Sequence, residues 1–164
     1  MRKMLLSMQP FWKEKIMSGE KVYEYRSRFP DEEILAYLYV STPVCGISGI
    51  LHLDKKIYLS DWKEKYKGNS ATIKRIEEYE SRKNKIAMPI LSFQKTNVIT
   101  RSELDEMLEK FIVPQSYYYL TKEMELTKLI ESRIKCEGKI KYNDFTVESE
   151  EDVCKKYRLS LIHI

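Results

Sequence analysis

A lysine, a glutamate and an arginine fall within six positions in the segment "KVYEYR", which runs from Lys21 to Arg26. Side chains alternate between the two faces of a β-strand, so Tyr23 and Tyr25 would share one face and Glu24 and Arg26 the other. In one interpretation the tyrosines are buried and the Glu–Arg pair faces solvent. In the other, the pair forms the wall of a cleft, where the carboxylate accepts from a nucleobase amine and the guanidinium donates or stacks.

Further polar residues lie at or near the ends of expected strands. Hydroxyl groups there commonly act as caps, but several converging on one barrel mouth would form a polar pocket. The segment "PQSYYYL" adds an amide, a hydroxyl and three adjacent rings. Tyrosine runs usually pack in a core, and they can also stack nucleobases for about 1–3 kcal/mol per base. The candidates of this group are Ser7, Gln9, Ser41, Thr42, Gln115, Ser116 and Tyr117.

The strong catalytic signatures are absent from the sequence: there is no nucleophile elbow, phosphate-binding loop, zinc-protease helix or acid-rich calcium loop. The cysteines Cys45, Cys136 and Cys154 form no CxxC pair, and the sequence has only two histidines. No zinc-ligand spacing can be assembled, so we expect neither a metal nor another cofactor. His52 is expected to be structural. Unpaired cysteines favour a reducing, cytoplasmic location.

The chain has 164 residues, enough for one domain with a single hydrophobic core. Hydrophobic residues make up 43% and charged residues 33%, which indicates a folded protein with a well-solvated surface. The formal net charge of +4 either follows from a lysine-rich composition or marks a weak anionic partner. No segment approaches the ~20 apolar residues of a membrane span. We therefore expect a soluble protein without a membrane partner.

The hydrophobic pattern predicts short strands interrupted by helices. Pro10 and Gly19 mark the start and end of a first helix. Gly46 and Gly49 lie inside one strand, which predicts a bulge or sharp coiling, and Pro89 restricts its strand to an edge or a bend. The expected strands are 3–8, 19–26, 33–42, 44–53, 85–99 and 139–142.

A capping box at Thr100 and Glu103 precedes a helix with core-facing spacing. That helix places apolar residues at i, i+3, i+4 and i+7, namely Leu104, Met107, Leu108 and Phe111. The expected helices are 10–18, 60–68, 70–83, 101–111 and 121–136, and another is expected to begin at Ser149.

These elements predict an α+β fold built on a small barrel. We divide the chain into a domain at residues 1–136 and a C-terminal extension at residues 137–164. The terminal "LSLIHI" resembles the translation of sequencing-adaptor read-through, so we assign no function to it.

Three segments, "LLSMQPFWKEKIMSGEKVYEYRSRFP", "YLYVSTPVCGISGIL" and "VPQSYYYL", resemble the ASCH domain, a branch of the PUA-like fold. The resemblance is closest to the ASCH-containing predicted regulators of bacteria, archaea and phages, and it covers about residues 2–54 and 112–120. It implies a small PUA-like β-barrel with flanking helices and a cleft beside the first helix. Related domains hold RNA or a modified base. The tail after about Cys136 lies outside the resemblance, and its own sequence pattern predicts a C-terminal helical appendage.

One ASCH branch consists of small amidohydrolases that remove the acetyl group from acetylated cytidine, using a lysine and a threonine of a GxKxxTxR element and a glutamate elsewhere. Lys21 and Arg26 match the lysine and arginine of that element, but Glu24 stands at the threonine position. A carboxylate does not replace a hydroxyl nucleophile, so catalysis by that route is not expected. A Lys21–Glu24 pair could still transfer protons if burial shifted their pKa values.

The leading hypothesis is a non-catalytic, regulatory module that binds RNA or a nucleotide-like ligand. Lys21, at the pocket rim, and Arg26 would contact phosphate, and Tyr117 would stack on a base. The residues expected to recognise a base edge are Glu24, Ser41 and Gln115.

Two alternatives remain open. The first is a hydrolase acting on a modified nucleoside or on RNA, with Lys21 and Glu24 as acid–base residues. The second is a protein-interaction domain whose charged helix, residues 70–83, meets a protein partner.

Overall fold

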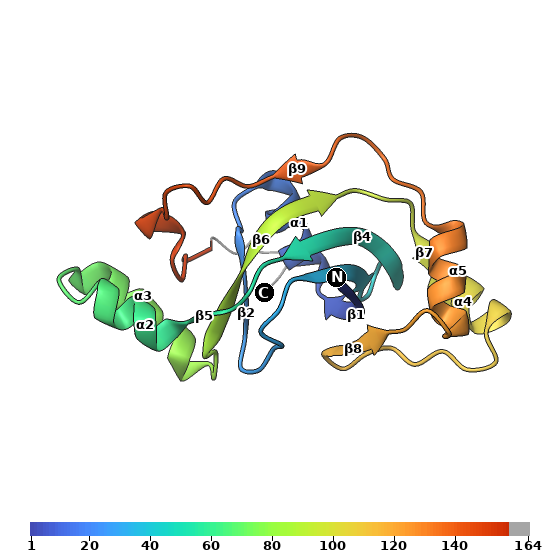
Figure 1. Cartoon of the computed structure of the whole chain (residues 1–164), viewed down its shortest axis with the longest axis horizontal. Coiled ribbons are helices and arrows are strands. Elements are labelled where there is room, and N and C mark those ends of the chain that lie inside the picture. The colour runs from blue at the N-terminus through green and yellow to red at the C-terminus, as the bar shows by residue number, and fades with distance from the viewer. Residues whose placement is uncertain (158–164) are drawn as a thin grey trace.

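The computed structural model describes residues 1–157, which form a strongly curled sheet with helices at both ends (Figure 1). The strands are β1 (Arg2–Met8), β2 (Tyr23–Arg26), β3 (Ile34–Val40), β4 (Gly46–Leu53), β5 (Ile57–Tyr58), β6 (Ile86–Gln94), β7 (Ile99–Thr100), β8 (Tyr117–Leu120) and β9 (Lys141–Tyr142). The helices are α1 (Pro10–Ser18), α2 (Leu59–Lys65), α3 (Ser70–Ser81), α4 (Arg101–Met107) and α5 (Glu125–Arg133), followed by one 3-10 turn, η1 (Glu150–Asp152). The expected α+β class with a curled, barrel-like sheet is confirmed.

The described strands form one sheet in the order β2-β6-β4-β3-β1-β8, with β5 and β9 paired to β6 and β7 paired to β4. β1 and β3 are parallel, and the other pairs are antiparallel. The β3–β4 register shifts between Tyr37 and Tyr39. Gly49 lies at this point with φ +100°, and a Cβ there would come within 2.9 Å of the Phe93 ring. Only glycine fits both demands, and the predicted bulge is confirmed.

β6 runs through both halves of the sheet. Its first half pairs with β2 and β5, and its second half pairs with β4 and β9. Pro89 lies where the partners change, opposite Tyr23 and close to a register shift at His52 and Leu53. Proline cannot donate to a ladder, so the expected bend occurs here, inside the sheet rather than at its edge.

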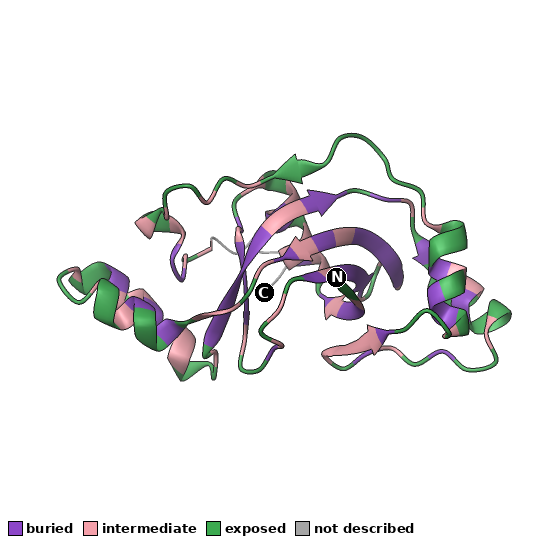
Figure 2. Ribbon diagram, in the orientation of Figure 1, coloured by how far each residue is buried: buried purple, intermediate pink, exposed green. Residues whose placement is uncertain are grey.

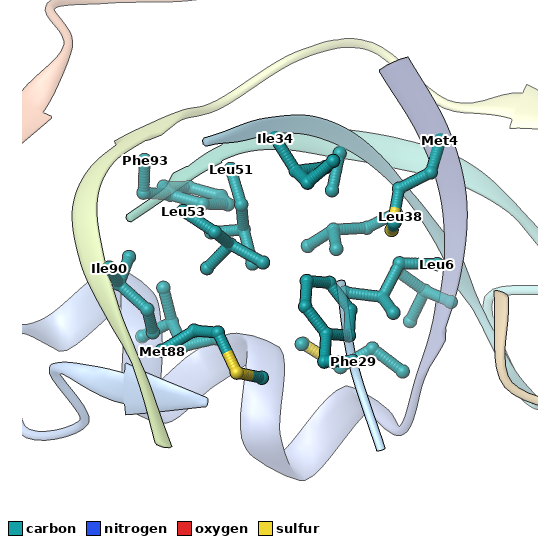
Figure 3. Packing of buried hydrophobic residues seen from close by; sticks show 14 of the residues in the cluster. Met4, Leu6, Phe29, Ile34, Leu38, Leu51, Leu53, Met88, Ile90 and Phe93 are labelled. Carbon is teal, nitrogen blue, oxygen red and sulfur yellow. The ribbon is translucent and has the colours of Figure 1, made fainter. Parts of the chain in front are cut away.

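The main core fills the space that the curled strands enclose, as the labelled side chains of Figure 3 show. α1 closes one side of this space with Ile16, which is buried. The helix begins with Pro10 at its first position and ends at Gly19, whose N–H donates to the Ile16 carbonyl. Both ends match the prediction, and they fix Trp12 at the margin of the core.

A second apolar cluster packs α4 and α5 against β1, β3 and β4. Leu104 is buried, as the helical spacing predicts. The predicted end at residue 111 is wrong, because α4 ends at Met107, which is 52% exposed, and Leu108 is extended. Phe111 instead reaches the cluster from irregular chain, with its ring 5.7 Å from that of Tyr39. The predicted helix 121–136 is likewise longer than α5.

A third cluster joins one face of β2 to α2 and α3. Tyr23, Trp62 and Ile76 are buried in it. The thin apolar stripe of α3 faces this cluster, so the charged face of the helix points to solvent (Figure 2). A protein partner for that charged face remains a prediction.

Residues 148–157, which we call the C-terminal strap, lie against α2, α3 and β2. Glu148 accepts a 2.9 Å hydrogen bond from the Trp62 indole, and the Cys154 N–H donates to the Tyr25 hydroxyl at 2.9 Å. The helix expected to begin at Ser149 is only the single turn η1. The terminal "LSLIHI" lies outside the described residues, and the domain boundary at residue 136 remains a prediction.

Among residues 1–157, no helix is long and apolar enough to cross a membrane. The same residues contain no group of three or more His, Cys, Asp or Glu side chains arranged to hold a metal ion. Cys45, Cys136 and Cys154 are free thiols.

Candidate functional site

Both faces of β2 are buried, so each interpretation of its alternating sequence is correct for one face. Tyr23 and Tyr25 point toward the α2–α3 side, where their side chains join the third cluster. Glu24 points to the other face and is also buried, at 6% exposure. The tyrosines therefore pack inward as in the first interpretation, while the carboxylate lies inside the molecule rather than in solvent.

Lys21, Glu24 and Arg26 form one group of buried charges, which we call the charged cluster. Lys21 Nζ lies 3.4 Å from Glu24 Oε1, and Arg26 Nη2 lies 3.2 Å from Glu24 Oε2. The side chains of Lys21 and Glu24 are 5% and 8% exposed, whereas that of Arg26 is 20% exposed. The cluster is thus closed at its lysine end and open to solvent at its arginine end.

Arg26 connects β2 to two segments far from it in the chain. Its Nη1 donates to Ser116 Oγ at 3.0 Å, and its Nη2 donates to the Ser7 carbonyl at 3.1 Å. The Ser7 N–H donates to the Ser116 carbonyl, and the Ser7 hydroxyl donates to the Pro114 carbonyl. The end of β1, the segment before β8 and the end of β2 therefore meet at the guanidinium.

Aromatic rings cover the lysine end of the cluster. Lys21 Nζ lies 4.7 Å from the centre of the Trp12 ring and 5.1 Å from that of Tyr25, distances at which a cation is attracted to a ring face. Tyr157 of the C-terminal strap packs edge-on against Trp12 at 5.3 Å. The expectation that Lys21 lies at the pocket rim is therefore wrong: the lysine is inside, beneath Trp12.

The surroundings shift the pKa values of both ionisable partners. Burial lowers the pKa of Lys21 and the nearby Arg26 lowers it further, against the opposing effect of Glu24. Burial alone would raise the pKa of Glu24, but Lys21 and Arg26 outweigh it and hold that pKa below its usual range. Since the guanidinium does not deprotonate, Glu24 stays ionised beside it, and the fully charged cluster carries one net positive charge.

The other predicted site residues lie outside this contact network. Ser41 bonds to the end of β1 through its N–H, and Thr42 is exposed with its hydroxyl 3.4 Å from Cys45 Sγ. Gln9 and Gln115 are exposed, and Tyr117 packs against Phe29 at 5.2 Å. The structure thus brings together Ser7, Lys21, Glu24, Arg26 and Ser116, and does not join Gln9, Ser41, Thr42, Gln115 or Tyr117 to them by a described contact.

Two residues that line the cluster were not selected from the sequence. Trp12 lies in α1, and the only signal toward it was the cleft beside the first helix that the family resemblance implies. Tyr157 lies in the segment that the sequence assigned to a separate extension, so nothing pointed to it. Burial and nearby negative groups, Glu24 among them, raise the pKa of Tyr157, so its hydroxyl stays protonated.

Comparison with solved structures identifies the fold. The ASCH protein of Zymomonas mobilis superposes with a TM-score of 0.62 at 24% sequence identity, covering 81% of this chain and 96% of that one. A tyrosine-to-phenylalanine mutant of the Zymomonas protein matches with a TM-score of 0.61 at 21% identity, covering 82% of this chain and 100% of that one. The chain has the ASCH fold.

The ASCH fold confirms the resemblance seen in the sequence at the level of architecture. A serine-to-alanine mutant of the same Zymomonas protein also matches, with a TM-score of 0.59 at 24% identity over 79% of this chain and 95% of that one. No family model and no curated protein matches the sequence. At this level of identity the likeness shows the ASCH fold alone and gives no roles to individual residues.

Proposed function

We propose that the protein binds RNA or a nucleotide-like ligand at the charged cluster. The observation that supports this most strongly is the open arginine end. There, the Arg26 guanidinium lies between Ser7 and Ser116 and is 20% exposed, while the two charges behind it are sealed. A fixed guanidinium with neighbouring hydroxyls suits a phosphate or the acceptor edge of a base.

Stability alone is a weak reason for the chain to keep three charges here. Taking Lys21 and Glu24 out of water costs several kcal/mol per ion, and well-packed apolar residues of similar volume often serve a fold equally well. Buried ionisable groups with shifted pKa values concentrate at functional sites. The cluster combines this burial with a partly exposed cationic end, which favours a binding role over a purely structural one.

The ligand would meet Arg26 first. Ser116 accepts from Arg26, and its neighbour Gln115 is exposed on the same segment, where its amide is free to recognise a base edge. Lys21 would contribute from inside the molecule. Its buried ammonium pairs with Glu24 and adds positive charge to the cluster. In this arrangement Glu24 orients the guanidinium, and it does not itself contact the ligand.

Titration with labelled RNA hexamers and with a panel of nucleosides and nucleotides at low salt tests the proposal. Arg26→Ala is expected to weaken binding about tenfold or more, since a charge-assisted hydrogen bond contributes about 1.5–3 kcal/mol. Arg101→Ala is the matched control, because Arg101 is an exposed arginine paired with Asp105 on α4. Absence of binding by the unmodified protein at low salt, where phosphate contacts are strongest, would refute the proposal.

A second candidate function is hydrolysis of an acylated nucleoside. The specific observation in its favour is that Lys21, with a lowered pKa, lies 3.4 Å from a buried carboxylate, so the pair could pass a proton. Water would add across the acyl–nitrogen bond, giving a carboxylic acid and the free amine. Incubation with acetylated cytidine followed by chromatography tests this, and any turnover must vanish in Lys21→Met.

A further inference from the structure

A polar cavity is lined by the residues that directly follow Arg26, and we call it the basic cavity. It has a volume of about 430 Å³ and opens to solvent between the β2–β3 turn, β5 and the α3–β6 turn. The size is in the range of small-ligand sites. The polar or aromatic residues that line it are Ser27, Arg28, Lys56, Tyr58, Ser60, Glu80 and Lys85.

Hydrogen bonds of the sheet hold the walls of the basic cavity together. Ile86 of β6 pairs with Arg26 on one side and with Tyr58 on the other. The Lys85 N–H donates to the Arg26 carbonyl at 3.1 Å, and the Leu59 N–H donates to the Lys85 carbonyl at 3.0 Å. The ends of β2, β5 and β6 therefore lie side by side, as Figure 1 shows.

Positive charge dominates the lining. Within residues 1–157, Arg28, Lys56 and Lys85 have no carboxylate within ion-pair distance. Lys56 Nζ instead donates to the Phe29 carbonyl at 3.3 Å, which anchors it at the cavity wall. The one acidic residue of the lining, Glu80, is paired with Lys63 at 3.0 Å.

Acceptors and an aromatic surface complete the cavity. The Asp31 carboxylate accepts from the backbone N–H of Lys56 at 3.3 Å, and no ion pair in the described part of the chain joins it to the Lys56 ammonium. Tyr58 is 46% exposed, and Lys56 Nζ lies 5.4 Å from the centre of its ring. An exposed ring beside three cations is the combination that binds single-stranded nucleic acid, where phosphates meet cations and bases stack.

We propose that the basic cavity binds the backbone phosphate of a single-stranded RNA whose adjoining nucleotide occupies the charged cluster, with Tyr58 stacking on a base. This inference rests on the proposed function. Arg26 links the two places: its side chain belongs to the charged cluster, its carbonyl bonds to Lys85, and Arg28 follows two positions later. A strand of RNA that leaves the cluster at Arg26 meets the cavity next.

The test is a salt titration of hexauridylate binding by a triple variant, Arg28→Gln with Lys56→Gln and Lys85→Gln. The glutamines keep length and polarity, and thermal unfolding checks that the variant is folded. The control is Lys122→Gln with Lys135→Gln and Lys139→Gln, which removes the same charge from exposed lysines outside the cavity. Uridine monophosphate, inorganic pyrophosphate and the hexamer are compared as probes.

The triple variant is expected to bind the hexamer about tenfold or more weakly. The slope of the logarithm of its binding constant against the logarithm of the salt concentration is expected to become shallower by about 2, since each phosphate contact on a single strand contributes about 0.7 to this slope. Uridine monophosphate binding should be unchanged. Unaltered hexamer affinity and salt dependence in the variant would overturn the inference while leaving the proposed function intact. Pyrophosphate binding tighter than that of the hexamer would also overturn it, because the cavity would then serve a free anion. Failure of the unmodified protein to bind any of the nucleotide probes would count against the proposed function itself.

Discussion

Two carboxylates in this protein each collect several donors, from α2 and its end in one case and from neighbouring residues of the same segment in the other. Glu148 of the C-terminal strap accepts from Trp62, Lys65 and Tyr66, and its side chain is 22% exposed. Glu24 is 8% exposed and faces two cations. The first arrangement attaches a strap to a helix with hydrogen bonds that water can partly replace. The second arrangement keeps ionised groups where water does not reach them. A fold does not need buried charges to attach one segment to another.

The difference predicts unequal costs of neutralising the two groups. Glu24→Gln leaves Lys21 buried without its counter-ion and should lower the free energy of unfolding by about 3–5 kcal/mol, the usual cost of breaking a buried ion pair. Glu148→Gln should cost about 1 kcal/mol, since the amide retains acceptor capacity and the pair with Lys65 is exposed. Urea unfolding of both variants measures this. Equal losses would show that the two networks do the same structural work.

The pH dependence of stability sharpens the comparison at the lysine. Because the pKa of Lys21 is lowered by burial, the unfolded chain binds more protons than the folded one between that lowered pKa and the ordinary value of 10.5. Stability contributed by this group must therefore rise with pH across that window. Lys21→Met should remove the rise, whereas Lys65→Met should not. A pH series of denaturation midpoints distinguishes the two variants, and identical slopes in wild type and Lys21→Met would contradict the assignment.

At the acidic end the sign reverses. The pKa of Glu24 is lower in the folded protein than in the unfolded chain, so its stabilising contribution is present above the unfolded value of 4.5 and is lost as the pH falls through the folded value. The wild type should lose this contribution on acidification, and Glu24→Gln should show a flatter acid limb. An acid limb of unchanged steepness in the variant would argue that Glu24 is not held ionised by its neighbours.

The smallest effect concerns the rings above the cluster. Tyr157→Ala removes the edge-on partner of Trp12, and the lost ring pair by itself should cost about 0.5–1.5 kcal/mol. The substitution should also uncover Lys21 and increase the quenching of tryptophan fluorescence by iodide. Tyr142→Ala is the control, because Tyr142 is 72% exposed. Unchanged quenching in the Tyr157 variant would mean that the strap does not cover the site.

The sheet was largely predictable because its signals are local. Alternation in β2, the bulge at Gly49 and the bend at Pro89 each depend on a few neighbouring residues. Helix ends were less predictable. The apolar spacing continues to Phe111, but α4 ends at Met107, and Phe111 packs in the second cluster from irregular chain, which local spacing does not indicate.

The candidate site was predictable only in part. Ser7, Glu24 and Arg26 could be grouped because polar residues at strand ends tend to meet at one mouth of a barrel. The burial of Lys21 could not be predicted, because it depends on Trp12 and on Tyr157, which lies at the other end of the described chain. Tyr117 was expected to stack on a ligand, but its ring already packs against Phe29. Whether the predicted residues bind a ligand remains a prediction.

The parallel pairing of β1 with β3 bears on how the molecule assembles. Parallel neighbours need a crossover connection, and here that connection is the stretch carrying α1 and the whole Lys21–Arg26 segment. Arg26 reaches its hydroxyl and carbonyl acceptors only after this crossover has closed and after a segment ninety positions further along has docked. Contacts of such long sequence separation form slowly. The guanidinium should therefore be among the last groups to reach its final position during folding, after the sheet around it has formed.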